Sequence, residues 1–588
     1  MDATVATVTA PSRAPVVAGR RRRRLVWAWS GLLLVVLTFL VIYPTLMLLL
    51  GALTGGNPVV DGYQLAKISL ANFVVVLADP NVHLALYHSL LACTGGTALA
   101  VVIGLAFAWI VVRTDTPCKR LIASTGMLPL FMPPLVAGIA WGILGSPKTG
   151  LLNILLARMG IAWRFDFYTM TGIILVFGMY YAPYVYMFTS AALRNMDPSL
   201  EEAAEISGAG PLRTLATVTF PLIAPAILSG MLLSFVVMLG IYGIPAVLGA
   251  PADLHVLTTY LYALTIWSPP RYSTAASVAV ILMVATGTLV VLQQKVLAGR
   301  TFTTVAGKAF RPRALRLGRW RFLTLGLAIT YLLIVVVLPT LALVVAAFRK
   351  FMFIRDLSSL FDTRQYSLLH FHQLFDNPST MVSVVNTMKV AVITAVLGGA
   401  LAFCIGYTVN RSNAPARRVI DLIATAPVAI PGLVIGVGYL WAWIAIPGGF
   451  YGSIWILAFA FVARFIPDTM KALSTSLMQI HRELEEAAWI CGRGLFSTIV
   501  SIVLPLARPG VIAAMTLLFI LAVRELGSSL FLYSSGTMVM AVQLLGFYEG
   551  GNISVTAAFS LVQMVILGVL IGITHRLSRE ATGGVGRV

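Results

Sequence analysis

Long apolar runs constrain the fold of this chain more than any other feature of its sequence. Of 588 residues, 59% are hydrophobic and only 11% are charged. Twelve of these apolar runs have about the 20 residues that a helix needs to cross about 30 Å of hydrocarbon. Lipid offers no partner to a free backbone N–H or C=O group, so each run is expected to be a helix. The predicted spans are 25–53, 84–112, 122–145, 168–192, 222–247, 274–296, 322–348, 383–409, 420–445, 452–471, 506–532 and 555–576.

The net charge of +20 indicates how these spans are oriented. Basic residues hold the loops that carry them on the cytoplasmic side, and we favour this reading over nucleic-acid binding. The segment 298–321 has seven Arg or Lys residues and no acidic residue. The apolar run after Arg20–Arg24 is too long for the core of a signal peptide. We therefore expect a retained first helix, with both termini in the cytoplasm.

The chain repeats itself in the same order. Pro44-Thr45-Leu46 corresponds to Pro339-Thr340-Leu341, and Arg113 corresponds to Arg411 at an offset of 298. The offset later falls to 284, so the first copy holds about fourteen extra residues, placed near 146–163. Six spans in each copy give a parallel repeat about an axis along the membrane normal. The predicted fold is an all-α polytopic membrane protein of about twelve transmembrane helices in two parallel six-helix repeats.

The repeat also predicts the division of the chain. A basic cytoplasmic N-terminus and C-terminus enclose two halves that a basic cytoplasmic linker joins. Each half carries one polar loop, at about 193–221 and about 472–505. The predicted segments are 1–24, 25–297, 298–321, 322–577 and 578–588.

The two polar loops share an unusual pattern. Each has Glu-Ala-Ala, then a glycine four residues after the second alanine, then an apolar-x-apolar-Pro motif. In the first loop these are Glu202-Ala203-Ala204, Gly208 and Val218-x-Phe220-Pro221; in the second they are Glu486-Ala487-Ala488, Gly492 and Ile502-x-Leu504-Pro505. Alanines propagate a short helix and the glycine ends it. Two copies at matched places favour two docking sites for a paired cytoplasmic partner over two ordinary amphipathic surface helices.

This pattern resembles the Glu-Ala-Ala loop of the permeases of binding-protein-dependent ABC importers with the type I fold. The second copy fits in full, and the first departs only at Val218 and Phe220. The resemblance implies that each loop forms a coupling helix in a groove of an ATP-binding subunit. It implies two copies of that subunit, an external solute-binding protein and membrane lipid as partners, and no nucleic acid. The residues implied to contact the ATPase are Glu201, Glu202, Ala203, Ala204, Gly208, Glu485, Glu486, Ala487, Ala488 and Gly492.

The chain has no Gly-x-x-x-x-Gly-Lys-Ser/Thr phosphate loop, so ATP and Mg²⁺ are expected on the partner subunits. We predict no catalytic residue, metal ligand or cofactor in the chain itself, which is a transport subunit and not an enzyme. The resemblance places it in the bacterial cytoplasmic (inner) membrane. A secondary transporter is the alternative class, because it too often has twelve spans in two parallel halves. That class predicts a relay of intramembrane carboxylates.

The fusion of two halves in one chain resembles a narrower group within these permeases, the ferric-iron permease group. The segments Tyr242–Gly249 and Val523–Gly527, followed by Leu530–Tyr533, carry this resemblance. It implies import of ferric iron, with a phosphonate, a sugar phosphate or a thiamine-like solute as alternatives.

Three residues are candidates for the substrate path: Arg524, Glu525 and Tyr242. Arg524 and Glu525 interrupt an apolar run, where a charge costs about 2.5–3.5 kcal/mol and usually faces a cavity or a partner. A charge pair at a helix end, reaching lipid headgroups or the binding protein, is the alternative. Arg464 and Asp468, four residues apart, are predicted to form an ion pair on one helix face.

Overall fold

The computed structural model describes residues 16–56, 68–298, 315–352, 360–446 and 448–583, which are mostly helical and form no β-strand. The helices of the first half are α1 (Val16–Leu37), α2 (Tyr43–Leu53), α3 (Ala71–Ala78), α4 (Pro80–Arg113), α5 (Lys119–Thr125), α6 (Pro134–Gly145), α7 (Leu151–Arg158), α8 (Met170–Asn195), α9 (Ser199–Ile206), α10 (Pro211–Thr214), α11 (Phe220–Leu239), α12 (Gly243–Leu248), α13 (Leu257–Ile266) and α14 (Tyr272–Ala298). Those of the second half are α15 (Trp320–Leu332), α16 (Leu338–Phe348), α17 (Leu369–Asp376), α18 (Pro378–Asn410), α19 (Arg417–Thr425), α20 (Gly432–Trp443), α21 (Ile454–Met478), α22 (Glu483–Ile490), α23 (Leu495–Thr498), α24 (Leu504–Val523), α25 (Ser529–Leu532), α26 (Met540–Glu549) and α27 (Ile553–Gly583).

The predicted segments 1–24, 298–321 and 578–588 lie partly outside the described residues, so their placement stays a prediction.

The prediction of about twelve spans compares with nine to eleven candidate spans among the described residues, the higher number counting each bent helix pair as one span. The described part of the chain contains nine helices long and apolar enough to cross a membrane. The predicted spans 122–145 and 420–445 are instead helix pairs bent by 96° and 113°. The bends fall at Pro133-Pro134 and Pro431-Gly432, because proline lacks an N–H donor and restricts the residue before it. The predicted span 452–471 corresponds to α21, a 25-residue helix that begins at Ile454, carries Arg464, Asp468 and Lys471, and is not one of the nine.

Two other predicted spans end too late. The spans 222–247 and 506–532 were expected as single helices, but α11 ends at Leu239 and α24 ends at Val523. The short helices α12 and α25 follow as separate elements. After α24, the carboxylate of Glu525 accepts the backbone N–H of Ser528 at 3.0 Å, which replaces a helical hydrogen bond with a local turn.

Matched distortions mark the repeat in three dimensions. In the described part of the chain, four five-residue π-helical segments each end two residues before a proline. They are Thr38–Ile42, Leu215–Thr219, Leu333–Val337 and Ile499–Val503. Because a proline inside a helix clashes with the preceding turn, a wider turn ahead of it relieves the crowding. The proline that ends each Glu-Ala-Ala motif therefore follows a π-helical segment in both halves.

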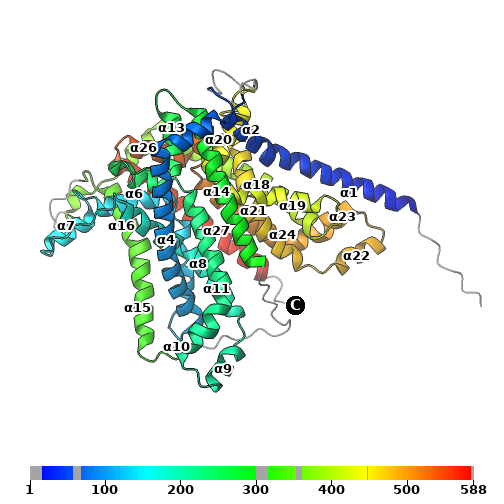
Figure 1. The fold of residues 1–588 in the computed structure, drawn as a ribbon, viewed down its shortest axis with the longest axis horizontal. Helices are drawn as coiled ribbons and strands as arrows, with labels where there is room; N and C mark the ends of the chain where they lie inside the picture. The colour runs from blue at the N-terminus through cyan, green and yellow to red at the C-terminus, as the bar shows by residue number, and fades with distance from the viewer. Residues whose placement is uncertain (1–15, 57–67, 299–314, 353–359, 447, 584–588) are drawn as a thin grey trace, which may run out of the picture.

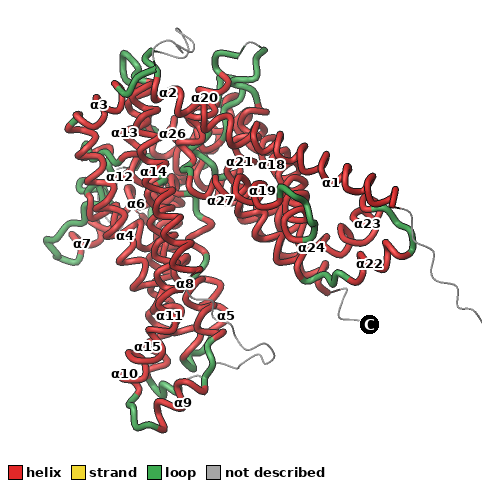
Figure 2. The backbone as a smooth tube through the Cα atoms, turned by 45° about the vertical axis from the view of Figure 1, so that its right-hand side comes forward, coloured by secondary structure: helices red, strands yellow, loops and turns green. Residues whose placement is uncertain are grey.

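The two halves touch at one end and spread apart at the other, as Figure 2 shows. One arm contains α8 and α11 of the first half, and the other contains α18, α21 and α24 of the second half. The short helices α9 and α22 lie at the tips of the two arms (Figure 2). We call the end at which the halves meet the vertex.

The first span of each half packs on the opposite half. In the first span, Tyr43 donates to the carbonyl of Ala442 at 2.9 Å, and the carbonyl of Leu40 accepts the hydroxyl of Tyr439 at 2.7 Å. In the second half, the hydroxyl of Tyr331 donates to the carbonyl of Met179 at 2.7 Å. In Figure 1, α1 extends beside α18 and α19, while α15 lies beside α4. Each first span therefore ties its own half to the other half.

Close helix packing inside each half gives a direct test of the fold. At Gly104 of α4, an added Cβ would lie 2.7 Å from the carbonyl oxygen of Ala182 in α8, so Gly104→Ala should destabilise the protein by about 1–3 kcal/mol. Gly326 of α15 has nothing within 4 Å, so Gly326→Ala should be neutral or stabilising, because alanine favours the helix. Thermal unfolding in detergent measures both. Equal melting temperatures for the two variants would contradict this packing.

Candidate functional site

The helices α9 and α22 end in the same way. Gly208 and Gly492 have φ of +82° and +80°, a conformation that favours glycine. The N–H of Gly208 bonds the carbonyl of Glu205 at 2.9 Å, and the next N–H bonds the carbonyl of Ala204 at 3.0 Å. Gly492 and Arg493 repeat both bonds at 3.0 and 2.9 Å. This paired arrangement is a Schellman motif, and it turns the chain sharply away from each short helix.

A buried ion pair fastens each of these helices to the bundle above it. In the first half, Arg113 at the end of α4 lies 3.0 Å from Glu201, whose carboxylate also accepts the hydroxyl of Thr219 at 2.7 Å. In the second half, Arg411 lies 3.5 Å from Glu485, which accepts the hydroxyl of Tyr407 at 2.9 Å. Of the residues implied to contact the ATPase, Glu201 and Glu485 are therefore engaged by arginines of the bundle.

The second glutamate of each pair remains on the surface. Glu202 and Glu486 are exposed, as are Ala203, Ala487 and both terminating glycines, whereas Ala204 is half-buried and Ala488 is buried. The sequence reasoning missed two apolar positions on the same side of each helix. They are Leu200 and Ile206 in α9 and Leu484 and Ile490 in α22. Ile206 and Ile490 are 88% and 87% exposed. Each follows the first alanine of its Glu-Ala-Ala motif by three residues, which places it on the same helix face, and this spacing could have identified both from the sequence.

A cavity lies between the halves near the vertex. It is open to solvent, spans about 950 Å³ including that open part, and is lined by α8, α11, α21, α24 and residues 427–431. Eight of the eighteen lining residues form four pairs separated by 284 positions: Tyr181 with Phe465, Tyr184 with Asp468, Val237 with Leu521 and Gly240 with Arg524. Matched residues from both halves surround this space, so it lies on the axis that relates them. We call it the chamber.

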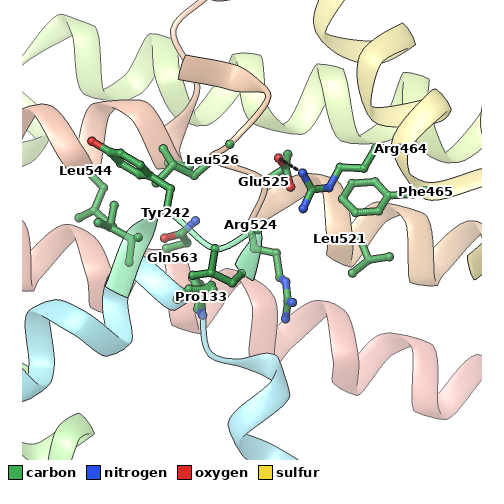
Figure 3. Close-up of a pocket in the computed structure, with 17 residues that line it drawn as sticks. Pro133, Tyr242, Arg464, Phe465, Leu521, Arg524, Glu525, Leu526, Leu544 and Gln563 are labelled. Atoms are coloured by element: carbon green, nitrogen blue, oxygen red, sulfur yellow. Dashed lines mark ion pairs between the residues drawn. The ribbon is translucent and has the colours of Figure 1, made fainter. Parts of the chain in front are cut away.

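The three candidate substrate-path residues line an adjoining cavity of about 650 Å³ (Figure 3). Glu525 is only 6% exposed, and its carboxylate lies 3.2 Å from the guanidinium of Arg464. Arg524 points away from Glu525 and donates to the carbonyl of Leu130 in the first half (Figure 3). The hydroxyl of Tyr242 is directed away from the ion pair, and its ring packs at 5.2 Å on Tyr262.

Two sequence expectations change as a result. Arg464 pairs with Glu525, so the predicted ion pair between Arg464 and Asp468 is wrong. Because Arg464 pairs with Glu525 and not with Asp468, Asp468 lines the chamber without this ion pair. Glu525 is buried where the halves meet, so it does not reach lipid headgroups as the alternative reading required.

The vertex is closed by bonds from one half to the other. Besides Arg524 and Leu130, the hydroxyl of Thr286 bonds the carbonyl of Ala429 at 2.5 Å. The hydroxyl of Tyr548 bonds the carbonyl of Val247 at 3.1 Å. These bonds hold the two halves together at the vertex, while the arms are apart at their tips.

Comparison with known families matches this duplicated architecture. The family model described as "Binding-protein-dependent transport system inner membrane component" matches residues 96–303 and again residues 395–580. The chain belongs to this family. It is thus the membrane permease component of an ABC importer, with the family domain present twice in one polypeptide.

Curated relatives include both fused and single-copy permeases. The permease is 25% identical to the ferric transport system permease protein FbpB of Actinobacillus pleuropneumoniae over 92% of this chain and 76% of the relative. It is 25% identical to a putative ferric transport system permease protein, FbpB 1, of Haemophilus influenzae over 87% of this chain and 78% of the relative. It is 31% identical to the molybdenum transport system permease protein ModB of Escherichia coli over 35% of this chain and 89% of the relative.

Among solved structures, the permease matches a bacterial alginate ABC transporter in complex with a pentasaccharide-bound periplasmic protein. The match has 18% identity and a TM-score of 0.40 over 48% of this chain and 96% of that chain. It adds nothing to the sequence comparison.

The buried ion pair of α22 predicts unequal roles for two adjacent glutamates. Glu485→Gln should destabilise the permease by about 3 kcal/mol or more, because it leaves the buried guanidinium of Arg411 without its countercharge. The matched change Glu486→Gln, one residue along, removes an exposed charge and should leave stability unchanged. Thermal unfolding of each purified variant measures this. Equal stability of both variants would show that the pair does not hold α22.

Proposed function

We propose that the permease passes ferric iron, delivered by an external solute-binding protein, across the bacterial inner membrane. The observation that carries this proposal is the extent of the similarity to permeases named for ferric transport. That similarity covers 92% of this chain and therefore both halves together. Relatives of single-copy size match only one stretch of about a third of it.

We infer that α9 and α22 are the coupling helices on which two ATP-binding subunits dock. Each helix presents an exposed Leu, Ala and Ile on one side, held at a fixed angle by a buried ion pair at its base. The small alanine permits close approach, and the flanking apolar side chains supply area that a groove would bury. One subunit would serve each tip, with ATP and Mg²⁺ bound there. The tips, the linker and both termini would then lie in the cytoplasm.

The chamber and the closed vertex suggest how docking would drive transport. Movement of the two arms toward each other would swing the halves as rigid bodies about the vertex and break the bonds that close it. The chamber would then open toward the binding protein. Separation of the arms would return it to the arrangement in Figure 2, from which the solute leaves on the side of α9 and α22.

An oxyanion is the second candidate substrate. Single-copy relatives named for molybdenum and sulfate transport are 31% and 32% identical to part of this chain. Arg464 and Arg524 line the chamber and suit an anion. Arg464 already bonds Glu525 and Arg524 already bonds the carbonyl of Leu130, so neither guanidinium is free to hold an anion.

The docking role predicts a strong effect of one exposed side chain. Ile490→Asp should leave membrane insertion intact but weaken binding of the ATP-binding subunit by roughly 1.5–3 kcal/mol, because an isoleucine side chain would no longer be buried in the groove. Ile490→Val keeps the apolar surface and should bind nearly as well as the native chain. Co-purification of the ATPase with each variant measures this. Normal binding by Ile490→Asp would refute the docking surface.

The charge of the substrate predicts which of two other variants reduces uptake more. If a cation passes, Glu525→Gln should reduce uptake more than Arg524→Gln, because it leaves the positive charge of Arg464 unopposed in the passage. Glutamine at position 524 can still donate to the carbonyl of Leu130. Uptake of radioactive ferric iron by cells that lack other iron importers measures this, with ATPase co-purification as the assembly control. The reverse order, or uptake of molybdate or sulfate in place of iron, would favour the oxyanion.

A further inference from the structure

Asp468 is a carboxylate placed deep in the permease. It lies fourteen residues after the start of α21 and ten residues before its end. At a rise of about 1.5 Å per residue, these separations are about 21 Å and 15 Å along the helix axis. An ionised side chain at such depth faces a cavity or a partner, because hydrocarbon cannot solvate it. Asp468 lines the chamber and is exposed there.

Asp468 has a free carboxylate among the side chains that the structure describes. None of them hydrogen-bonds to it or lies within ion-pair distance. Its nearest basic neighbours along α21 are Arg464, which pairs with Glu525, and Lys471, which is exposed. The fold therefore keeps one carboxyl group without an ion-pair partner on the wall of the chamber, although a basic side chain is available four residues away.

Two tyrosine side chains of the first half also line the chamber. Tyr184 occupies the position matched to Asp468 by the 284-residue offset, and Tyr181 lies one turn earlier on α8. Their rings are stacked with centroids 6.2 Å apart and planes inclined by 6°, and both line the chamber. Within the described residues, neither hydroxyl has a hydrogen-bond partner, although Tyr181 is only 6% exposed. Three oxygen donors without partners thus border the chamber.

We propose that Asp468, Tyr184 and Tyr181 form a transit site for a hard, highly charged cation. This inference rests on the proposed import of ferric iron. Hard cations prefer carboxylate and other oxygen ligands, and no cluster of three or more His, Cys, Asp or Glu residues occurs in the described part of the chain. A cation that binds a phenol displaces its proton to water in the chamber. Three protein ligands leave water to complete the coordination.

The neighbouring positive charges suit a site of passage. Arg464 and Arg524 line the same chamber, so they oppose a cation that stays there. A transport site must bind strongly enough to admit the ion and weakly enough to release it. One free carboxylate with two phenols, beside two engaged guanidiniums, meets both requirements.

The test uses the permease reconstituted in liposomes with its ATPase and binding protein, and measures uptake of ferric iron. Asp468→Asn and Tyr184→Phe should each reduce uptake roughly tenfold or more, at least the effect of losing an outer-shell partner of a metal ligand. Asp468→Glu keeps the carboxylate and should retain most uptake. Matched controls are Tyr186→Phe, also on α8 but outside the chamber lining, and Asp421→Asn in α19. Both controls should transport normally.

A second readout is independent of transport. Ferric citrate added to the purified complex should produce the visible charge-transfer absorption of iron bound to phenolate, and Tyr184→Phe should weaken it while Tyr186→Phe does not. If the native complex imports no iron, the proposed function fails and the site fails with it. If the native complex imports iron and both Asp468→Asn and Tyr184→Phe do so at the native rate, only the transit site is overturned. Faster uptake in Asp468→Asn would also overturn it.

Discussion

Backbone that leaves the helical conformation inside a bilayer is stable only where protein or water covers it. This permease breaks its helices at four places within the apolar core: the bends before α6 and α20, and the ends of α11 and α24. All four meet at the vertex. An added Cβ at Gly243 would lie 2.7 Å from the backbone of Leu135 in the same half, and one at Gly240 would lie 3.0 Å from Pro431 of the other half. The breaks cover one another, and this requirement fixes where the two halves touch and where the chamber lies.

The duplication preserves some positions and changes others. At the arm tips, the ion pair, the Schellman turn and the exposed isoleucine occur in both halves with nearly the same geometry. Around the chamber, by contrast, Asp468 replaces Tyr184, Arg524 replaces Gly240 and Glu525 replaces Ile241. The charged side chains of the chamber therefore come from the second half. Identical tips suit two copies of one ATPase, and a single fused chain lets the walls of its passage differ.

The sequence predicted the all-helical class, the duplication and the polar loops, because apolar run length and motif spacing are local properties. It did not predict which charges pair. Arg464 and Asp468 satisfy the four-residue rule, yet Arg464 bonds Glu525, sixty-one positions away, because the break after α24 brings that carboxylate to it. Glu201 and Glu202 are also indistinguishable in the sequence. Only the position of Arg113 at the end of α4 decides that Glu201 turns inward.

We infer that the solute crosses the membrane through the chamber between the halves. Val237 and Leu521 face it from opposite sides at matched positions of the repeat. A double variant with cysteine at both, in a background where the four native cysteines are replaced by serine, can be joined by a short bifunctional thiol reagent. The account predicts that cross-linking stops transport, that a cleavable linker restores it on reduction, and that each single variant is unaffected. Unchanged transport through the cross-linked protein would place the path elsewhere.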